Sequence, residues 1–129
     1  METPELAAPG YWESEEPDIR FNPAGVTNRH GLEALIKNES RLRGHVLLAT
    51  SAGRNAPKWI AVSKQAILAS ASAVNAHLES GPGDHWLLAL PDFHVGGMGV
   101  FARAQLAAKY KSNVVISTPE ANSPTVHCL

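Results

Sequence analysis

The stretch W-L-L-A-L-P-D-F-H-V-G-G, residues 86–97, contains the change of pattern that decides the fold. It begins with an apolar run, Trp86–Leu90, whose length and composition are typical of a buried strand, and Pro91 ends that run. The glycine pair at 96–97 then opens a helical pattern that continues to about Tyr110. A strand that passes through a short turn into a helix is the repeating unit of α/β proteins.

The same alternation extends to both sides of this stretch. Ser63 can cap a helix that stops at Gly81-Pro82-Gly83, and Gly44 can end an earlier helix. The expected elements are a helix around residues 32–42, strands at 45–50 and 58–62, a helix from 64 to about 80, and a strand at 113–117. The sequence therefore predicts an α/β fold in which a partial layered sheet is flanked by helices.

Length and composition limit the kinds of protein. The 129 residues allow one domain, and a hydrophobic fraction of 44% is close to the globular average. The net charge of −1 argues against a nucleic-acid partner, and a single cysteine, Cys128, excludes an internal disulfide framework. No apolar run approaches the roughly 20 residues that cross a bilayer. Because the acidic N-terminus has no leader pattern, we expect a cytoplasmic protein without a membrane partner.

Charge divides the chain into three expected regions. Residues 1–20 hold six of the twelve acidic side chains, so we expect residues 1–28 to form an acidic, proline-containing arm that is extended or poorly ordered. Residues 29–117 are expected to form the α/β domain, and residues 118–129 a tail. Between Arg29 and Lys64 seven basic residues face two acidic ones. This excess indicates either a solvated helix face or an anion site.

The first candidate site is the loop Thr50–Lys58, which reads T-S-A-G-R-N-A-P-K and follows an apolar strand. Its backbone amides and hydroxyl groups, together with Arg54 and Lys58, could converge on phosphate oxygens. It is not a P-loop, because Pro57 stands where that motif needs a glycine. The same residues also fit a simple turn between two strands.

The second candidate is His94, which follows a strand end and precedes a glycine pair and a helix. Ligands of α/β proteins bind at such positions. The imidazole could bond a carboxylate, or it could be a loop histidine bonded to a backbone carbonyl. The six histidines show no H-x-x-x-H spacing, so no metal site is expected.

Taken together, the two segments carry a resemblance to a known family. T-S-A-G-R-N-A-P-K-W, Thr50–Trp59, is similar to a phosphate loop that reads T-S-G-T-T-G-x-P-K-G, and Ile60–Lys64 to the helix start that follows it. Leu90–Gly97 matches the motif L-P-L-F-H-x-(G/S)-G at all but one fixed position, while Asn75 and Asp84 stand at two further matching places. Both motifs belong to the adenylate-forming (AMP-binding) acyl-CoA synthetases. Within that superfamily the chain looks most like the o-succinylbenzoate–CoA ligases of menaquinone synthesis.

The resemblance implies a two-step ligase that uses ATP, Mg²⁺ and CoA. A carboxylate attacks the ATP α-phosphate to give an acyl-adenylate and pyrophosphate, and the CoA thiol then displaces AMP. The residues that would bind the ATP phosphates are Thr50, Ser51 and Lys58. By the same correspondence His94 would be the catalytic residue that faces the substrate carboxylate, and Gly96 and Gly97 would leave room for the acyl group.

The phosphate loop departs from the family pattern. Where the family has G-T-T-G, this chain has Ala52, Gly53, Arg54 and Asn55. Gly53 restores some backbone freedom one position along, and Arg54 either supplies cationic donors to the phosphates or fills their space. Weak or altered ATP binding is therefore expected.

The resemblance covers only about Val46 to Val115. The family's Y-G-x-T-E segment, its ribose-binding aspartate and its C-terminal catalytic lysine are not found, so we expect a partial ligase that is not competent as this chain alone. The sequence after Ser117 resembles nothing in the family and is interpreted as a premature or divergent stop. Two other hypotheses stay open: a non-catalytic anion-binding or interaction module that self-associates through open sheet edges, and a gene remnant.

Overall fold

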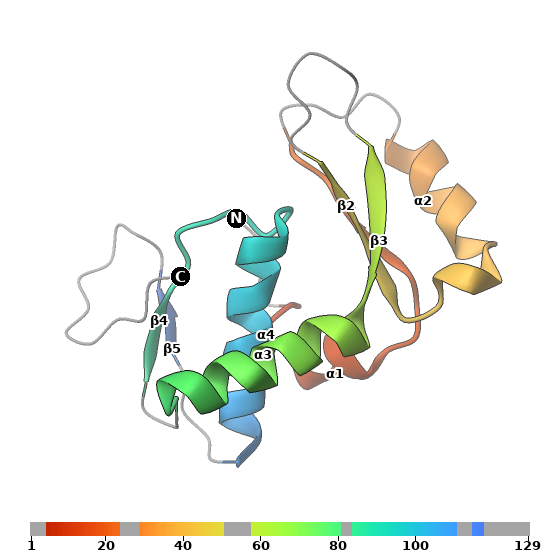
Figure 1. Ribbon diagram of the computed structural model, residues 1–129. Coiled ribbons are helices and arrows are strands. Elements are labelled where there is room, and N and C mark those ends of the chain that lie inside the picture. The colour runs from red at the N-terminus through yellow and green to blue at the C-terminus, as the bar shows by residue number, and fades with distance from the viewer. Residues whose placement is uncertain (1–4, 24–28, 51–57, 81–83, 111–114, 118–129) are drawn as a thin grey trace.

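The chain forms two small sheets that are linked by a pair of helices (Figure 1). The computed structural model describes residues 5–23, 29–50, 58–80, 84–110 and 115–117. Its elements in chain order are α1 (Pro9–Glu13), β1 (Asp18–Arg20), α2 (Arg29–Lys37), a 3₁₀ turn (Ser40–Leu42), β2 (His45–Ala49), β3 (Trp59–Ser63), α3 (Lys64–Leu78), β4 (His85–Leu87), α4 (Val95–Tyr110) and β5 (Val115–Ser117). The expected α/β arrangement with flanking helices is confirmed.

The larger sheet has the strand order β1-β2-β3. β1 runs parallel to β2, with Ile19 opposite Leu47, and β3 is antiparallel to β2, with Leu48 opposite Ile60. The smaller sheet pairs β4 with β5 in parallel. Each parallel pair is joined by a crossover that contains a helix, as parallel strands require. The strands expected at 45–50, 58–62, 86–90 and 113–117 are all present with shifted or shorter bounds.

α3 and α4 begin where the sequence predicts. Ser63 is extended, and its hydroxyl oxygen accepts a hydrogen bond of 3.0 Å from the backbone N–H of Ala66, so it caps α3. At the other end of α3, Glu79 adopts the left-handed conformation with φ 53°. The helix expected around 32–42 is divided: α2 ends at Lys37, and the 3₁₀ turn follows before Gly44, whose φ is +70°.

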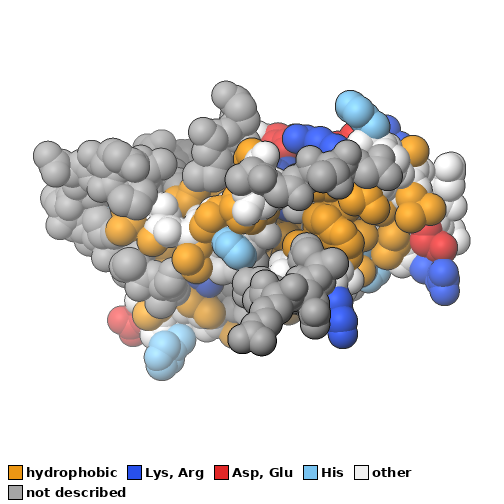
Figure 2. Space-filling view, turned by 90° about the horizontal axis from the view of Figure 1, so that it is seen from above, with side chains coloured by type: hydrophobic (Ala, Val, Ile, Leu, Met, Phe, Trp, Pro, Cys, Tyr) orange, Lys and Arg blue, Asp and Glu red, His pale blue; other side chains and the backbone are white. Residues whose placement is uncertain are grey.

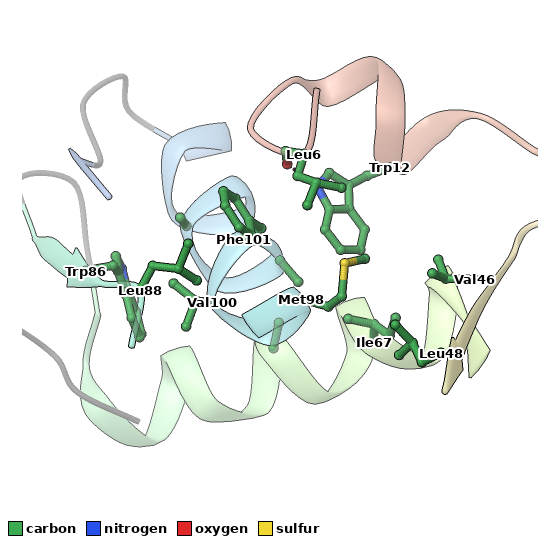
Figure 3. Packing of buried hydrophobic residues seen from close by; sticks show 13 residues of the cluster. Leu6, Trp12, Val46, Leu48, Ile67, Trp86, Leu88, Met98, Val100 and Phe101 are labelled. Atoms are coloured by element: carbon green, nitrogen blue, oxygen red, sulfur yellow. The ribbon is translucent and has the colours of Figure 1, made fainter. Parts of the chain in front are cut away.

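The main core lies between α1, α3, α4 and one face of the larger sheet (Figure 3). Met98 on α4 points toward the ring of Trp12, with Ile67 and Leu48 beside it, whereas Trp86, Leu88 and Val100 gather on the other side of α4. Trp86 and Met98 are fully buried. A second, smaller cluster around Ile19, Phe21 and Ile36 packs α2 against the opposite face of the larger sheet. These two clusters make the layers on either side of that sheet.

Residues 5–23 differ from the extended or poorly ordered arm that the sequence predicts. They supply α1 and β1, and Leu6, Trp12, Ile19 and Phe21 are all buried. The segment has few apolar side chains, but these are spaced so that each reaches one of the two clusters. Several of its acidic groups are paired with arginines rather than solvated alone, which lowers the cost of ordering it. The expected boundaries at residues 28 and 117 stay predictions.

Candidate functional site

The end of the β2–β3 hairpin carries two of the predicted phosphate-binding residues. The backbone N–H of Thr50 donates to the carbonyl oxygen of Lys58 at 2.8 Å, and the N–H of Lys58 donates to the hydroxyl oxygen of Thr50 at 3.1 Å. The strands that meet there are strongly apolar, while the Lys58 side chain is exposed. The structure thus brings Thr50 and Lys58 together. Ser51, Gly53 and Arg54 lie outside the described residues.

His94 lies in the turn between β4 and α4. Its backbone N–H donates to the carbonyl oxygen of Pro91 at 3.1 Å, and its own carbonyl oxygen accepts from the N–H of Met98 at 3.0 Å. The imidazole is half-buried, with its ring centroid 4.9 Å from that of Phe93. The first turn of α4 therefore begins directly after His94, and the N–H groups of such a first turn have no partner within the helix.

The two glycines after His94 allow the turn to pack against α4. A Cβ atom on Gly97 would stand 2.0 Å from the carbonyl oxygen of Pro91, and one on Gly96 would stand 2.4 Å from a methyl carbon of Leu90. Only a residue without a side chain fits at Gly97, because the obstacle is backbone. This packing explains Gly97 without a ligand, while the role of Gly96 and Gly97 toward an acyl group stays a prediction.

A nearly buried ion pair connects this turn to β1. The guanidinium of Arg20 donates from Nη2 to Oδ2 of Asp92 at 2.8 Å, and their side chains are 12% and 11% exposed. The other terminal nitrogen donates to Glu5 at 2.6 Å and to Asp18 at 3.3 Å. Burial opposes the charge of Arg20, but the bonds to these carboxylates outweigh it and raise its pKa. Arg20 therefore stays charged, and its bond to Asp92 joins β1 to the turn before α4, two segments that are 72 residues apart in the sequence.

A cavity of about 720 Å³ lies between β1, α2 and the same turn. Phe21, Ile36 and Phe93 supply its apolar wall, and Arg20 and Asp92 supply charges. The wall thus reaches the residue before His94. The sequence did not suggest this cavity, because β1 was not expected there.

Arg103 is a cation on α4 that the sequence reasoning missed. Burial lowers its pKa, its Nε atom is buried without a hydrogen-bond partner, and no carboxylate pairs with it within the described residues. The guanidinium lies 5.3 Å from the ring centroid of Trp86 and folds back over Gly99, where a Cβ atom would stand 3.1 Å from Nη1. Arg103 thus extends toward the end of α4 that His94 precedes. The sequence carried no signal for a shared site with His94, since nine residues of α-helix at about 3.6 residues per turn place two positions on opposite faces.

Asn75, which the sequence comparison singled out, lies beside Arg103. Its Nδ2 donates to the carbonyl oxygen of Arg103 at 2.9 Å and joins α3 to α4, while its Oδ1 is buried and has no hydrogen-bond partner among the described residues. Buried polar groups of proteins are usually hydrogen-bonded, to water where no protein group is in reach.

Lys64, the basic residue at the start of α3, is used within the fold. Its ammonium group donates to the carbonyl oxygens of Tyr11 at 2.7 Å and of Ser14 at 3.0 Å, and it lies 4.3 Å from the centroid of the Tyr11 ring. Burial lowers its pKa, and Asp18 and Glu16 partly offset this effect. Its contacts anchor α1 to α3.

The side of the molecule seen in Figure 2 exposes hydrophobic side chains between the segments drawn in grey. Over the whole described part of the chain, the exposed large hydrophobic residues are Leu35, Ile60, Leu90 and Val95, with exposures of 69%, 50%, 44% and 59%. No group of three or more potential metal ligands occurs in the described ranges. Across those same ranges, no helix has the length and apolar character needed to span a membrane.

Comparison with known proteins gives matches to one kind of enzyme. The chain is 42% identical over 67 residues to 2-succinylbenzoate–CoA ligase of Salmonella typhimurium, a match that covers 48% of this chain and 15% of that protein. It is 35% identical over 72 residues to a probable 2-succinylbenzoate–CoA ligase of Mycobacterium tuberculosis, covering 56% and 18%. The chain therefore spans less than a fifth of the length of these curated relatives. No family model matches.

A solved structure supports the fold. An AMP-forming acyl-CoA synthetase-like protein from Dyadobacter fermentans superposes with a TM-score of 0.50 at 21% identity, over 70% of this chain and 24% of that one. At this identity the likeness concerns the fold alone.

Proposed function

The chain is related to the AMP-binding acid–CoA ligases and resembles the 2-succinylbenzoate–CoA ligases, and from this premise we propose that it forms the carboxylate-binding part of such an enzyme. The proposed reaction has two steps. The substrate carboxylate attacks the α-phosphate of ATP, which forms an acyl-adenylate and releases pyrophosphate. The thiol of CoA then attacks the acyl carbon and displaces AMP.

The observation that carries this proposal is the position of His94 directly before α4, a helix that also carries Arg103, whose buried Nε has no hydrogen-bond partner among the described residues. An imidazole at the start of α4, beside unpaired backbone N–H groups, suits a carboxylate. Arg103 adds a buried cation with donors to spare, and a carboxylate would compensate its charge. Buried charges that lack a partner are candidates for ligand binding rather than for stability.

The proposed nucleotide side is the β2–β3 hairpin end. Lys58 is exposed and held at its backbone by Thr50, so its ammonium group is available to phosphate oxygens, and Mg²⁺ would accompany the nucleotide. The chain spans less than a fifth of the length of its curated relatives. We therefore propose that these 129 residues bind the carboxylate and do not complete the ligation unaided.

Binding of o-succinylbenzoate and of ATP to purified protein tests the proposal. His94→Ala and Arg103→Gln should each weaken o-succinylbenzoate binding by about tenfold, the loss expected for one charge-assisted bond, and leave ATP affinity nearly unchanged. Arg29→Gln, which removes an exposed arginine of α2, is the matched control. A large loss of ATP affinity in His94→Ala would show that His94 does not act on the carboxylate side. Wild-type affinity for o-succinylbenzoate in both variants would contradict the carboxylate site.

A second candidate, an interaction module, is favoured by the sheet edge. Within the described residues β3 lies at the edge of the larger sheet, and Ile60 on it is half exposed. An uncovered strand edge can pair with a strand of another chain. A stable dimer that is insensitive to ATP and o-succinylbenzoate, and that Ile60→Lys dissociates in sedimentation, would support this candidate.

A further inference from the structure

We infer that the Arg20–Asp92 ion pair is a positioning device that fixes the turn carrying His94. This inference rests on the proposed role of His94 in carboxylate binding. It assigns a function to β1, a segment far from the turn in sequence, and to Asp92, which stands where the family motif quoted above has leucine.

The guanidinium of Arg20 is oriented by other carboxylates besides Asp92. Glu5 accepts from it at 2.6 Å and Asp18 at 3.3 Å, and Asp18 is held in turn by the hydroxyl of Tyr11, which donates at 2.6 Å. Tyr11 is fixed from the other side by Lys64. Arg20 is therefore a rigid point, and a hydrogen bond from it restricts the group that accepts it.

The turn needs such an external restraint. Its own backbone bonds are local, from His94 to Pro91 and from Met98 to His94. Gly97 lets Pro91 lie against α4, which fixes the start of the turn. Asp92 follows directly and is tied to β1 at 2.8 Å, so the two consecutive residues that lead into Phe93 and His94 are both anchored. Leucine at position 92 could not accept this bond, so Arg20 and Asp92 depend on each other.

Amide hydrogen exchange of the unliganded protein measures the restraint directly. The N–H groups of His94 and Met98 report the turn, and those of β2 and β3 report global unfolding. Arg20→Gln and Asp92→Leu should each speed exchange of the two turn amides by about tenfold relative to the β2–β3 amides. The double variant should match the single variants, because either change alone breaks the bond.

Titration of the His94 imidazole by NMR separates positioning from direct electrostatics. Loss of a cation in Arg20→Gln and loss of an anion in Asp92→Leu would displace the titration midpoint in opposite directions if charge alone acted. Positioning predicts that both variants shift the neutral-form signal of His94 the same way, toward the value of an unrestrained histidine. Glu15→Gln, which removes an exposed ion pair with Arg43, should change neither readout.

If the Arg20→Gln protein does not fold, Arg20→Lys is the alternative variant for the exchange experiment. It retains the charge but not the forked geometry, and it should give an intermediate increase in turn exchange. Unchanged exchange at His94 and Met98 in every folded variant would overturn the inference. Because these readouts need no ligand, the inference can fail while o-succinylbenzoate binding persists. It can also hold in a protein that does not bind o-succinylbenzoate.

Discussion

The turn before α4 and the end of the β2–β3 hairpin are held by different kinds of interaction. The turn is tied to a distant strand by the Arg20–Asp92 pair and packs against α4 through Gly97. The described part of the hairpin end is held by two hydrogen bonds between Thr50 and Lys58, and its basic side chain is exposed. One region is fixed by tertiary contacts, and the other by its own neighbours along the sheet.

This difference matches the chemistry proposed for the two regions. An imidazole that faces a carboxylate must have a defined position, since misplacement by about 1 Å can cost much of its effect. A lysine that neutralises phosphates acts as a point charge on a flexible chain and tolerates variation. Substitutions should therefore be more costly in the turn than at the hairpin end.

The largest effect is expected from Gly97→Ala. The added Cβ would overlap the carbonyl oxygen of Pro91, so we expect a loss of about 3 kcal/mol in the free energy of unfolding. Urea denaturation measures it. Gly10→Ala is the control, because a Cβ there meets nothing within 4 Å. Equal stability of the two variants would mean that the turn does not pack on α4 as described.

Lys64→Met should cost about 2 kcal/mol near pH 7, because the carbonyl oxygens of Tyr11 and Ser14 lose a charged donor. Burial lowers the pKa of Lys64 in the folded state, while the unfolded chain keeps a value near the usual ~10.4. Between these two values the unfolded state binds more protons. The free energy of unfolding should therefore rise with pH toward ~10.4.

Lys64→Met should abolish that rise, and thermal unfolding at a series of alkaline pH values measures it. Lys37→Met, at an exposed lysine in the last turn of α2, is the control and should retain it. If the free energy of unfolding of Lys64→Met rose with pH by the same amount, other titrating groups would be its cause.

Thr50→Val should cost about 1 kcal/mol, the usual net value of one hydrogen bond, because the N–H of Lys58 loses its side-chain acceptor. Denaturant unfolding checks the value. Ser70→Val is the control, because it also replaces a hydroxyl side chain by valine, at an exposed position of α3. A loss near that of Gly97→Ala would remove the contrast between the two regions.

Lys58→Ala should change stability by less than about 0.5 kcal/mol, since the side chain is exposed. It should nevertheless weaken any binding of pyrophosphate, which calorimetry can measure. Lys37→Ala provides the matched exposed lysine. Undiminished pyrophosphate binding in Lys58→Ala would contradict the proposed nucleotide side.

The sequence predicted the elements that have strong local signals. Ser63 followed by helical periodicity located the start of α3, and the glycine pair after His94 located the start of α4. Pairing of Thr50 with Lys58 follows from two adjacent strands joined by a loop. The sequence did not predict β1, because three residues in an acidic, proline-containing segment are too few to show a hydrophobic periodicity.

The sequence by itself determined the alternation of strands and helices and the resemblance to AMP-binding ligases, because both depend on residue types at short spacing. Only the tertiary structure decided that Arg20 reaches Asp92, that Pro91 occupies the space beside Gly97, and that Arg103 is left without a carboxylate partner among the described residues. Such contacts join positions far apart in the chain or depend on which side chains share a buried space. Local pattern carries no information about either, since burial and pairing arise when the layers pack together.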